Sequence, residues 1–239
     1  MRFENTSVYN IYNAILGARN PKNSWSKSDS IFKGFNGKIE NTNIGKKDLE
    51  LAQTLIKAGS EHRKFMRQIF VSVDITAPLY WWKEFDTYKV GTVSNSTSTM
   101  HKLASTPITR DCFEMDDFDK TVAWEENELE DWDRFKWFDI EQVFSSTITN
   151  LEKLRRKYNE TKDKRYWKEL IRLLPESWLQ KRTVTMDYEN LLAICSKGQR
   201  RFHKLTEWSK SFIDWARSLP YAQELIFIDE FSEKAVVDR

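Results

Sequence analysis

The chain has 239 residues and a formal net charge of +2; it is rich in aromatic residues (10 Trp, 15 Phe, 8 Tyr) but holds only 7 Gly and 3 His. Glycine is scarce and no GxGxxG or GxxxxGK(S/T) run occurs, which disfavours folds that bind nucleotides through a glycine-rich loop. The three His residues are scattered and the two Cys residues stand alone, which excludes zinc ribbons and disulfide scaffolds. We therefore expect no metal site. The two thiols are unpaired, no apolar run approaches the roughly 20 residues of a membrane span, and the N-terminal residues lack the apolar stretch of a signal peptide. These features predict a cytoplasmic protein.

Apolar residues at helical spacing, with caps and stop signals, predict a series of helices. In chain order these are 7–18 with Ser7 as N-cap, 47–58, Pro78 to about Lys89, 145–158, 163–173, 188–197 capped by Asp187, and Thr206 to about Leu219. Two β-rich segments, 68–76 and 182–186, predict strands. The polar segments 19–46 and 91–99 predict loops, and 112–141 predicts short helices and turns.

The chain shows no internal repeat and no domain linker. We therefore predict one α+β domain over residues 1–239 in which helices predominate, with an acidic insertion at about 111–141. The polar tail, about 232–239, is expected to fray.

Charge is distributed unevenly along the second half of the chain. Residues 111–141 hold 13 acids against 3 bases, whereas residues 152–172 hold 9 bases against 4 acids. Two solvated faces explain this pattern; alternatively, the acidic segment covers a basic surface of the same or a neighbouring subunit. The near-neutral total disfavours nucleic-acid binding, which would otherwise use the aromatic residues and the bases of 152–172.

One hydroxyl-rich segment could bind an anion. Residues 88–99 offer a cation, hydroxyls, amides and accessible backbone, a set that binds phosphate through many modest donors, although a flexible loop also explains it. A second cationic set comprises Lys197, Arg200, Arg201 and Lys204, and arginine suits a planar or phosphate partner. Together these segments suggest an anionic ligand such as a nucleotide.

The order of motifs over residues 60–104 and 165–215 resembles the flavin-dependent thymidylate synthases. The family has a His, a strand, an Ala-Pro helix start and the signature RHR-x-x-S-x-N-E-x-S-x-R-Y. The matching residues are His62, Ala77-Pro78, Thr87-Tyr88-Lys89 and, with one inserted residue, Asn95-Ser96-Thr97-Ser98-Thr99-Met100-His101. A second stretch is similar through Leu174-Pro175, Gln199-Arg200, His203 and Glu207.

The signature is only partly kept. Four of its positions are kept or conservatively changed, at Lys89, Thr92, Asn95 and Ser98. Two arginines, the Glu and the final Arg-Tyr are absent. Glu84 stands where the family has a Gln that helps hold the nucleotide. The resemblance thus leaves open a different nucleotide or a different way of binding it.

The resemblance implies a small antiparallel sheet packed against several helices. It also implies FAD as cofactor, with NADPH and methylenetetrahydrofolate as co-substrates, for one-carbon transfer to C5 of dUMP. It further implies a homotetramer whose sites lie between subunits, and FAD binding without a glycine-rich motif.

Family roles carry over to individual positions. Ser98 and Thr99 would meet the nucleotide phosphate, and Arg200 would stabilise charge that develops on the pyrimidine, so that Arg200 and Ser98 are the catalytic candidates. The substrate-binding set is Glu84, Ser96, Ser98, Thr99, Arg172 and Arg200. The cofactor-binding set is His62, Tyr88, Lys89, Thr92, Asn95, Asp187 and His203.

Alternatives remain open for these residues and for the function. Ser98 and Thr99 could be loop residues, Arg200 a salt-bridge partner, and His62 or His203 structural. The whole chain could be a non-catalytic nucleotide-binding or assembly protein on the same fold, because signature arginines are lost.

Overall fold

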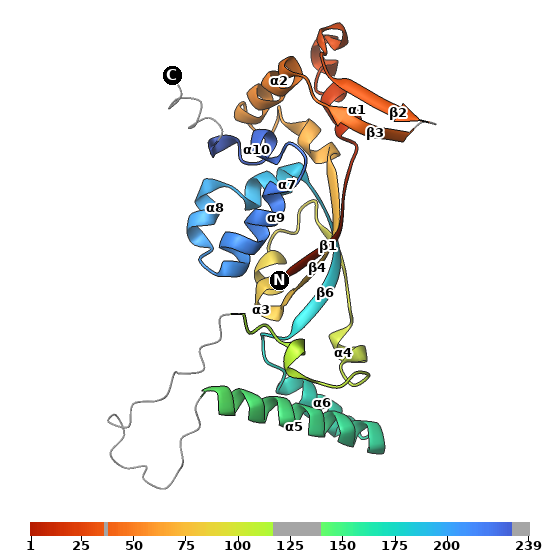
Figure 1. Ribbon diagram of the computed structural model, residues 1–239, viewed down its shortest axis with the longest axis vertical. Coiled ribbons are helices and arrows are strands. Elements are labelled where there is room, and N and C mark those ends of the chain that lie inside the picture. The colour runs from red at the N-terminus through yellow and green to blue at the C-terminus, as the bar shows by residue number, and fades with distance from the viewer. Residues whose placement is uncertain (36–37, 117–139, 231–239) are drawn as a thin grey trace, which may run out of the picture. The chain divides into compact units, whose positions relative to one another are not determined.

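A computed structural model describes residues 1–35, 38–116 and 140–230 (Figure 1). The helices are α1 (Ile11–Gly17), α2 (Lys46–Lys57), α3 (Leu79–Phe85), α4 (Thr99–Lys102), α5 (Ile140–Thr161), α6 (Lys164–Arg172), α7 (Tyr188–Ile194), α8 (Lys197–Phe202), α9 (Ile213–Arg217) and α10 (Ala222–Leu225). The strands are β1 (Arg2–Tyr9), β2 (Ile31–Phe35), β3 (Lys38–Asn43), β4 (Phe70–Pro78), β5 (Val93–Ser96) and β6 (Leu179–Asp187). Short 3-10 turns and a π-helical turn at Glu207–Phe212 complete the chain.

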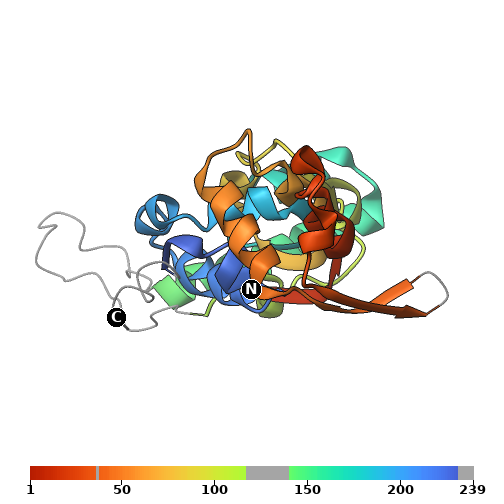
Figure 2. The same cartoon turned by 90° about the horizontal axis from the view of Figure 1, so that it is seen from above.

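Four strands form one sheet in the order β1-β4-β6-β5. Strands β4 and β6 run antiparallel, because the Tyr188 N–H donates to Ile69 O at one end and the Leu79 N–H donates to Trp178 O at the other. A second sheet, β2-β3, is a separate antiparallel ribbon (Figures 1 and 2). The predicted α+β class, with helices and a small antiparallel sheet, is confirmed.

The described residues gather into two compact units. Unit 1 draws on residues 1–75, 84–95 and 182–239, and unit 2 on residues 76–83 and 96–181. Strands β4 and β6 each contribute residues to both units. The prediction of a single domain stays a prediction.

Aromatic side chains fill much of the core of unit 1. Phe212 is fully buried and lies 5.3 Å from the ring of Trp215 and 5.4 Å from that of Trp208. Phe3 of β1 stacks on Trp215 at 5.0 Å and so ties the strand to α9. Because each such ring buries 150–250 Å², these residues contribute strongly to the stability of the unit.

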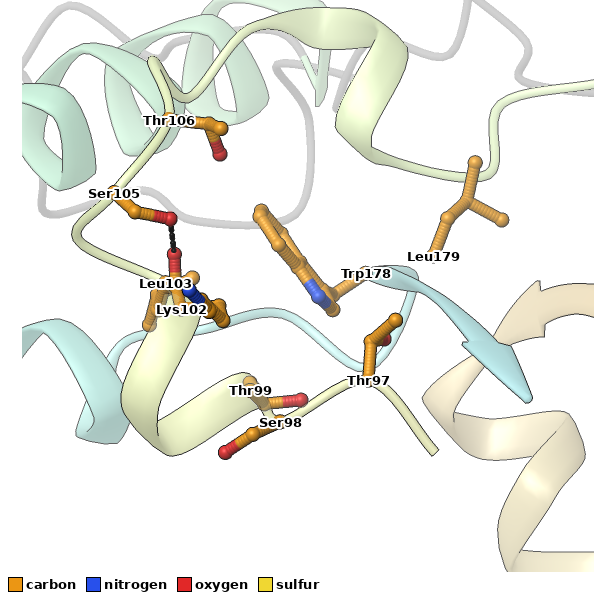
Figure 3. A pocket seen from close by; sticks show the side chains of 9 residues that line it. All are labelled: Thr97, Ser98, Thr99, Lys102, Leu103, Ser105, Thr106, Trp178 and Leu179. Carbon is orange, nitrogen blue, oxygen red and sulfur yellow. Dashed lines mark hydrogen bonds between the residues drawn. The ribbon is translucent and has the colours of Figure 1, made fainter. Parts of the chain in front are cut away.

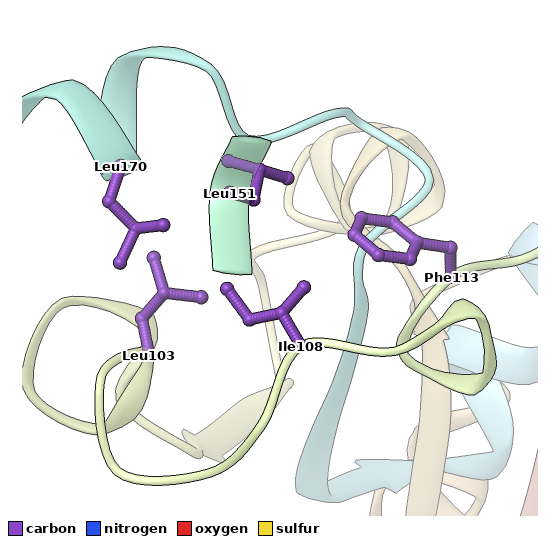
Figure 4. Packing of buried hydrophobic residues seen from close by; sticks show 5 residues of the cluster. All are labelled: Leu103, Ile108, Phe113, Leu151 and Leu170. Carbon is purple, nitrogen blue, oxygen red and sulfur yellow. The ribbon is translucent and has the colours of Figure 1, made fainter. Parts of the chain in front are cut away.

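Unit 2 has its own aliphatic core, shown in Figure 4. Leu151 of α5 and Leu170 of α6 are fully buried, and they meet Leu103, Ile108 and Phe113 from the segment after α4. The two helices therefore bury one stripe each, as their amphipathic sequences predict.

Several predicted elements are confirmed and others are wrong. Predicted helices 47–58, 145–158 and 163–173 correspond to α2, α5 and α6, and the predicted strands fall within or overlap β4 and β6. Segment 19–46 is not a loop throughout, because it contains the β2-β3 ribbon. Segment 91–99 likewise contains β5.

Three predicted helix boundaries are wrong. Ser7 lies in β1, and α1 begins only after Asn10, whose φ of 69° separates strand from helix. Pro78 ends β4, and α3 ends at Phe85, short of Lys89. Thr206 makes no capping hydrogen bond with its side chain. The predicted turns at 117–139 and the tail at 232–239 lie outside the described residues.

Two classes of site are also absent from the part of the chain that the structure describes. None of its helices combines the length and apolar character needed to cross a bilayer. No group of three or more His, Cys, Asp or Glu side chains among these residues could hold a metal ion.

Candidate functional site

A cavity of about 300 Å³ lies within unit 2 (Figure 3). Five hydroxyl residues, one lysine, one tryptophan and two leucines line it: Thr97, Ser98, Thr99, Lys102, Leu103, Ser105, Thr106, Trp178 and Leu179. Convergent hydroxyls beside an apolar wall are typical of a small-ligand site, and the volume is at the lower end for such sites.

Gln180, the second residue of β6, fixes one wall of this cavity. Its buried side-chain amide donates to Thr97 O at 2.9 Å and to Thr99 Oγ1 at 3.1 Å. The Gln180 carbonyl in turn accepts from Trp82 Nε1 at 3.0 Å. Thr99 Oγ1 accepts the hydrogen bond from the Gln180 amide, so the hydroxyl can still donate its own proton to a second group, such as an oxygen of a bound anion.

The short helix α4 sets the positions of the other wall residues. The N–H groups of Lys102 and Leu103 donate to Ser98 O and Thr99 O at 3.0 and 3.1 Å. Leu103 is anchored in the core of unit 2, and Ser105 Oγ donates to Lys102 O at 2.6 Å. The serine and threonine side chains therefore stand on backbone that is held at both ends.

A second cluster of polar and aromatic side chains lies in unit 1. The Tyr88 hydroxyl is 2.9 Å from His203 Nε2 and donates to Gln199 Oε1 at 3.3 Å. The His203 ring stacks on Trp208 with centroids 4.6 Å apart, and its Nε2 is 3.8 Å from a carboxylate oxygen of Glu84. Burial, reinforced by the Glu84 charge, raises the pKa of Tyr88, so this phenol stays protonated as a donor at neutral pH.

The turn that carries Tyr88 is docked on the start of α7. Asn190 Nδ2 donates to Val90 O at 2.5 Å. Gly91 has a φ of 78°, and a Cβ on it would lie 2.9 Å from Asn190 Oδ1, so both conformation and space require glycine here. Thr92 Oγ1 donates to Tyr88 O at 2.6 Å and closes the turn.

No family model matches the chain, and no curated protein matches its sequence. Among 103 matching chains of solved structure, the flavin-dependent thymidylate synthase ThyX of Helicobacter pylori, complexed with FAD and dUMP, aligns over 96% of this chain and 99% of that one. The identity is 18% and the TM-score 0.62. The chain has the fold of the flavin-dependent thymidylate synthases. This confirms the resemblance seen in the sequence.

Two further solved structures are similar to this chain: a second one of the thymidylate synthase and one of a nucleotide methylase. A second ThyX structure from Helicobacter pylori, with FAD and dUMP, has 18% identity, a TM-score of 0.60 and coverage of 93% and 95%. A UMP/dUMP methylase, PolB from Streptomyces cacaoi, bound with 5-Br dUMP, has 16% identity, a TM-score of 0.51 and the same coverage. Identities this low establish the fold only.

Within this thymidylate-synthase-like fold, two of the predicted substrate-binding residues share the cavity of unit 2. These are Ser98 and Thr99, both half-buried. Ser96 is exposed at the end of β5, and Arg172 ends α6 with its guanidinium paired to Glu169; neither lines the cavity wall. Glu84 belongs to unit 1, beside His203.

Most of the predicted cofactor-binding residues fall in unit 1. Tyr88 and His203 touch, Thr92 supports their turn, and Lys89 and Asn95 are exposed on the same segment. His62 is exposed in the turn after α2.

Asp187 has a local structural task. Its side chain accepts the Asn190 N–H at 2.8 Å and forms a capping box at the start of α7, as the sequence predicts. Burial raises the pKa of this carboxyl, although the hydrogen bond opposes the shift.

Arg200 makes strong contacts with two carboxylates. In α8, its guanidinium pairs with Glu230 and lies 3.1 Å from Asp229, and its side chain is 16% exposed. It also lies over the Phe227 ring, 5.5 Å from the centroid. These contacts match the salt-bridge alternative drawn from the sequence, and they leave the catalytic role of Arg200 as a prediction.

Five residues of these two clusters were not predicted as site residues from the sequence: Lys102, Trp178 and Gln180 at the cavity, and Gln199 and Trp208 beside His203. Lys102 lies one residue after the signature match, so extending that match would have found it. Trp178 and Gln180 carry no local signal, because their place depends on the pairing of β6 with the chain near Thr97.

Proposed function

We propose that this protein transfers a one-carbon unit to C5 of a pyrimidine deoxynucleotide such as dUMP, with FAD as cofactor and NADPH and methylenetetrahydrofolate as co-substrates. The observation that supports the proposal best is the cavity of unit 2. It holds Ser98, which matches the family signature, and the adjacent Thr99 on a wall of hydroxyl donors in a chain with the thymidylate synthase fold.

The chemistry of the cavity suits a nucleotide phosphate. The Thr99 hydroxyl has its acceptor site used by Gln180 and can donate to a phosphate oxygen. Ser98, beside it at the start of α4, offers a second hydroxyl on a fixed backbone. Hydrogen bonds from neutral donors to an ionised acceptor are stronger than neutral pairs, so several together can orient the nucleotide.

The Tyr88 cluster of unit 1 fits a flavin. An isoalloxazine needs flat apolar surface with hydrogen-bond donors at its edge, and the partly exposed rings of Tyr88 and His203, backed by the buried Trp208, combine both features. The four side chains of β5 are exposed, so the Asn95 amide is accessible to a ligand. Lys89 and Thr92 would complete the set of residues of this segment that hold FAD. The predicted set also includes His62 and Asp187, which lie farther from the signature in the sequence.

The overall reaction balances with these co-substrates. The C5–H bond of the uracil would break and its proton would leave, while a new bond would join C5 to the methylene carbon of methylenetetrahydrofolate. The two bonds from that carbon to folate nitrogens would break, and tetrahydrofolate would be the leaving group. FAD held by the Tyr88 cluster would take a hydride from NADPH, and in its reduced form would provide the hydride that converts the transferred methylene to methyl. The chain's own task is to orient the ring, exclude water and stabilise negative charge, which we assign to Arg200.

The proposal extends to assembly and location. Family members of this fold are homotetramers with sites between subunits, and we propose the same arrangement here, in the cytoplasm.

A second candidate function is nucleotide binding without catalysis. It is favoured by the contacts of Arg200, whose guanidinium is occupied by Asp229 and Glu230. An arginine held by two carboxylates has less positive potential to offer a reacting ring.

Two measurements on the purified full-length chain test the proposal. Absorbance after incubation with FAD and gel filtration should show a bound oxidised flavin. Release of tritium from [5-³H]dUMP, with FAD, NADPH and methylenetetrahydrofolate present, should then follow. Binding of dUMP without tritium release supports the non-catalytic alternative, and a chain that retains no flavin contradicts the flavin assignment.

A further inference from the structure

We propose that Lys102 and Trp178 are the residues that recognise a mononucleotide in the cavity of unit 2. In this assignment Lys102 is the counter-charge of the phosphate, and Trp178 is the platform on which the base stacks. The inference deepens the proposed function, on which it rests for the choice of a pyrimidine nucleotide.

Lys102 provides the positive charge that the cavity otherwise lacks. It is charged, whereas the other eight lining residues are neutral. Met100 and His101 stand where the signature has Arg and Tyr, so the signature's cation is missing from that position. Lys102 is exposed and forms no ion pair with any residue that the structure describes. Its ammonium is therefore available to a phosphate, as a point charge and not a bidentate fork.

Trp178 presents a rigid aromatic surface. The backbone N–H of Trp178 donates to Pro175 O at 3.0 Å, its carbonyl accepts from the Leu79 N–H at 3.1 Å, and its backbone bridges to Phe113. The Phe113 ring meets the indole edge-on, at 5.5 Å and 80°. These contacts fix the ring from one side, while Figure 3 shows the indole projecting among the other lining residues.

The arrangement suits a base with a phosphate. Figure 3 places Thr97, Ser98 and Thr99 below the indole and Ser105 and Thr106 on its other side. Aromatic side chains bind bases by stacking on their flat faces, and every base has such a face. A volume of about 300 Å³ accommodates a mononucleotide and is small for a dinucleotide such as FAD or NADPH.

Calorimetry with two ligands separates the two roles in the full-length protein. dUMP carries both groups, and deoxyuridine carries the ring alone. Lys102→Met should weaken dUMP about tenfold or more and leave deoxyuridine unchanged, while Lys102→Arg should retain most of the affinity. Trp178→Leu should weaken both ligands about tenfold, and Trp178→Tyr should restore much of the loss.

Matched controls exclude general effects of charge and stability. Lys168→Met removes an exposed lysine of α6 in the same unit, outside the cavity wall, and should change neither affinity. Trp25→Leu does the same for a half-exposed tryptophan of unit 1. Thermal melting of each variant shows whether it folds, and Lys102→Met with its two ligands keeps the test decisive if Trp178→Leu does not fold.

The outcomes separate this inference from the proposed function. Tritium release from dUMP with unchanged KM in both Lys102→Met and Trp178→Leu overturns the assignment while the enzyme activity stands. Lys102-dependent and Trp178-dependent binding of dUMP without tritium release supports the assignment and contradicts the activity. Equal dUMP affinity in Lys102→Met and Lys168→Met would rule out the phosphate role.

Discussion

The side-chain amide of Gln180 donates a hydrogen bond to Thr99 Oγ1 over 3.1 Å, across a sequence separation of 81 residues. The same amide holds Thr97 O at 2.9 Å. This pair joins β6 to the start of α4, and it occupies one acceptor position of the Thr99 hydroxyl. Gln180 is thus a positioning residue that acts through Thr99.

We predict that Thr99→Val and Gln180→Leu are coupled in nucleotide binding. Thr99→Val keeps the shape and removes the hydroxyl, so dUMP affinity should fall about tenfold, the effect of roughly 1.4 kcal/mol. Gln180→Leu should cause a similar loss, and the double variant should lose little more than either. Calorimetry with dUMP measures all three. Thr99→Ser, which keeps the hydroxyl, should bind as the wild type does; additive losses in the double variant would contradict the coupling.

Removal of the Tyr88 hydroxyl should weaken flavin binding. Tyr88→Phe loses the contacts with His203 and Gln199, and we expect FAD affinity to fall about fivefold, near 1 kcal/mol for one hydrogen-bonding group. Fluorescence titration of FAD measures this. An unchanged FAD affinity would show that the Tyr88 cluster does not hold the flavin.

The pKa of Tyr88 gives a pH test of the same cluster. Burial raises this pKa above 10.0, so the neutral phenol is favoured in the folded protein. Its contribution to stability is present below pH 10 and is lost as pH rises through the folded pKa. FAD affinity should therefore show no loss from Tyr88 ionisation up to pH 9, and a tyrosine titration near pH 8 would be inconsistent with the burial described.

Arg200 and Arg217 form a matched pair for testing catalysis. Both pair with Glu230 and lie over the Phe227 ring, Arg217 at 4.2 Å from its centroid. Each alanine variant should lower the melting temperature by a few degrees, about 2–4 °C for each kcal/mol lost. Only Arg200→Ala should also lower turnover by about 10²–10³. Equal turnover in the two variants would make Arg200 a structural residue.

Glu152 should make stability depend on pH in the acid range. Hydrogen bonds from Arg155, from the Ile108 N–H and from Arg156 lower its pKa from 4.5 to about 2. Because the folded pKa is the lower one, its stabilisation is present above pH 4.5 and is lost as pH falls toward 2. Compared with Glu152→Gln, the wild type should lose about 1–2 kcal/mol across this range, measured by urea unfolding. A constant difference between the two proteins would contradict the assigned contacts.

Two glycines should respond to alanine with opposite signs. Gly91→Ala places a Cβ 2.9 Å from Asn190 Oδ1 at a φ of 78°, so it should destabilise by about 1–3 kcal/mol. Gly198 lies inside α8 with nothing within 4 Å of its added Cβ, so Gly198→Ala should stabilise by about 0.5–1 kcal/mol. Chemical denaturation of both variants measures the difference, and the same sign for both would contradict it.

The sequence by itself determined the elements whose causes are local. Helix α2 follows from leucine spacing, and the capping of α7 follows from Asp187, since a cap needs only residues three positions apart. Strand β5 was not predicted, because its sequence of one valine and three polar residues shows no alternation of apolar and polar side chains.

The candidate site was predicted in part. The hydroxyl segment that contains Ser98 and Thr99 was found because several donors follow one another in the chain. The signature match also drew attention to Tyr88 and His203. Their mutual contact joins residues 115 positions apart, however, and no local pattern encodes it.

Only the tertiary structure decided how these residues combine. Trp178 and Gln180 reach the Thr97–Thr99 wall because β6 pairs with the chain beside it, through the Thr97 N–H and Lys181 O at 2.9 Å. Arg200 acquired its carboxylate partners through the fold of residues near 229, which its own helix does not specify. Local sequence sets the conformation and chemistry of each segment, whereas the free energy of long-range strand pairing and core packing selects which segments meet.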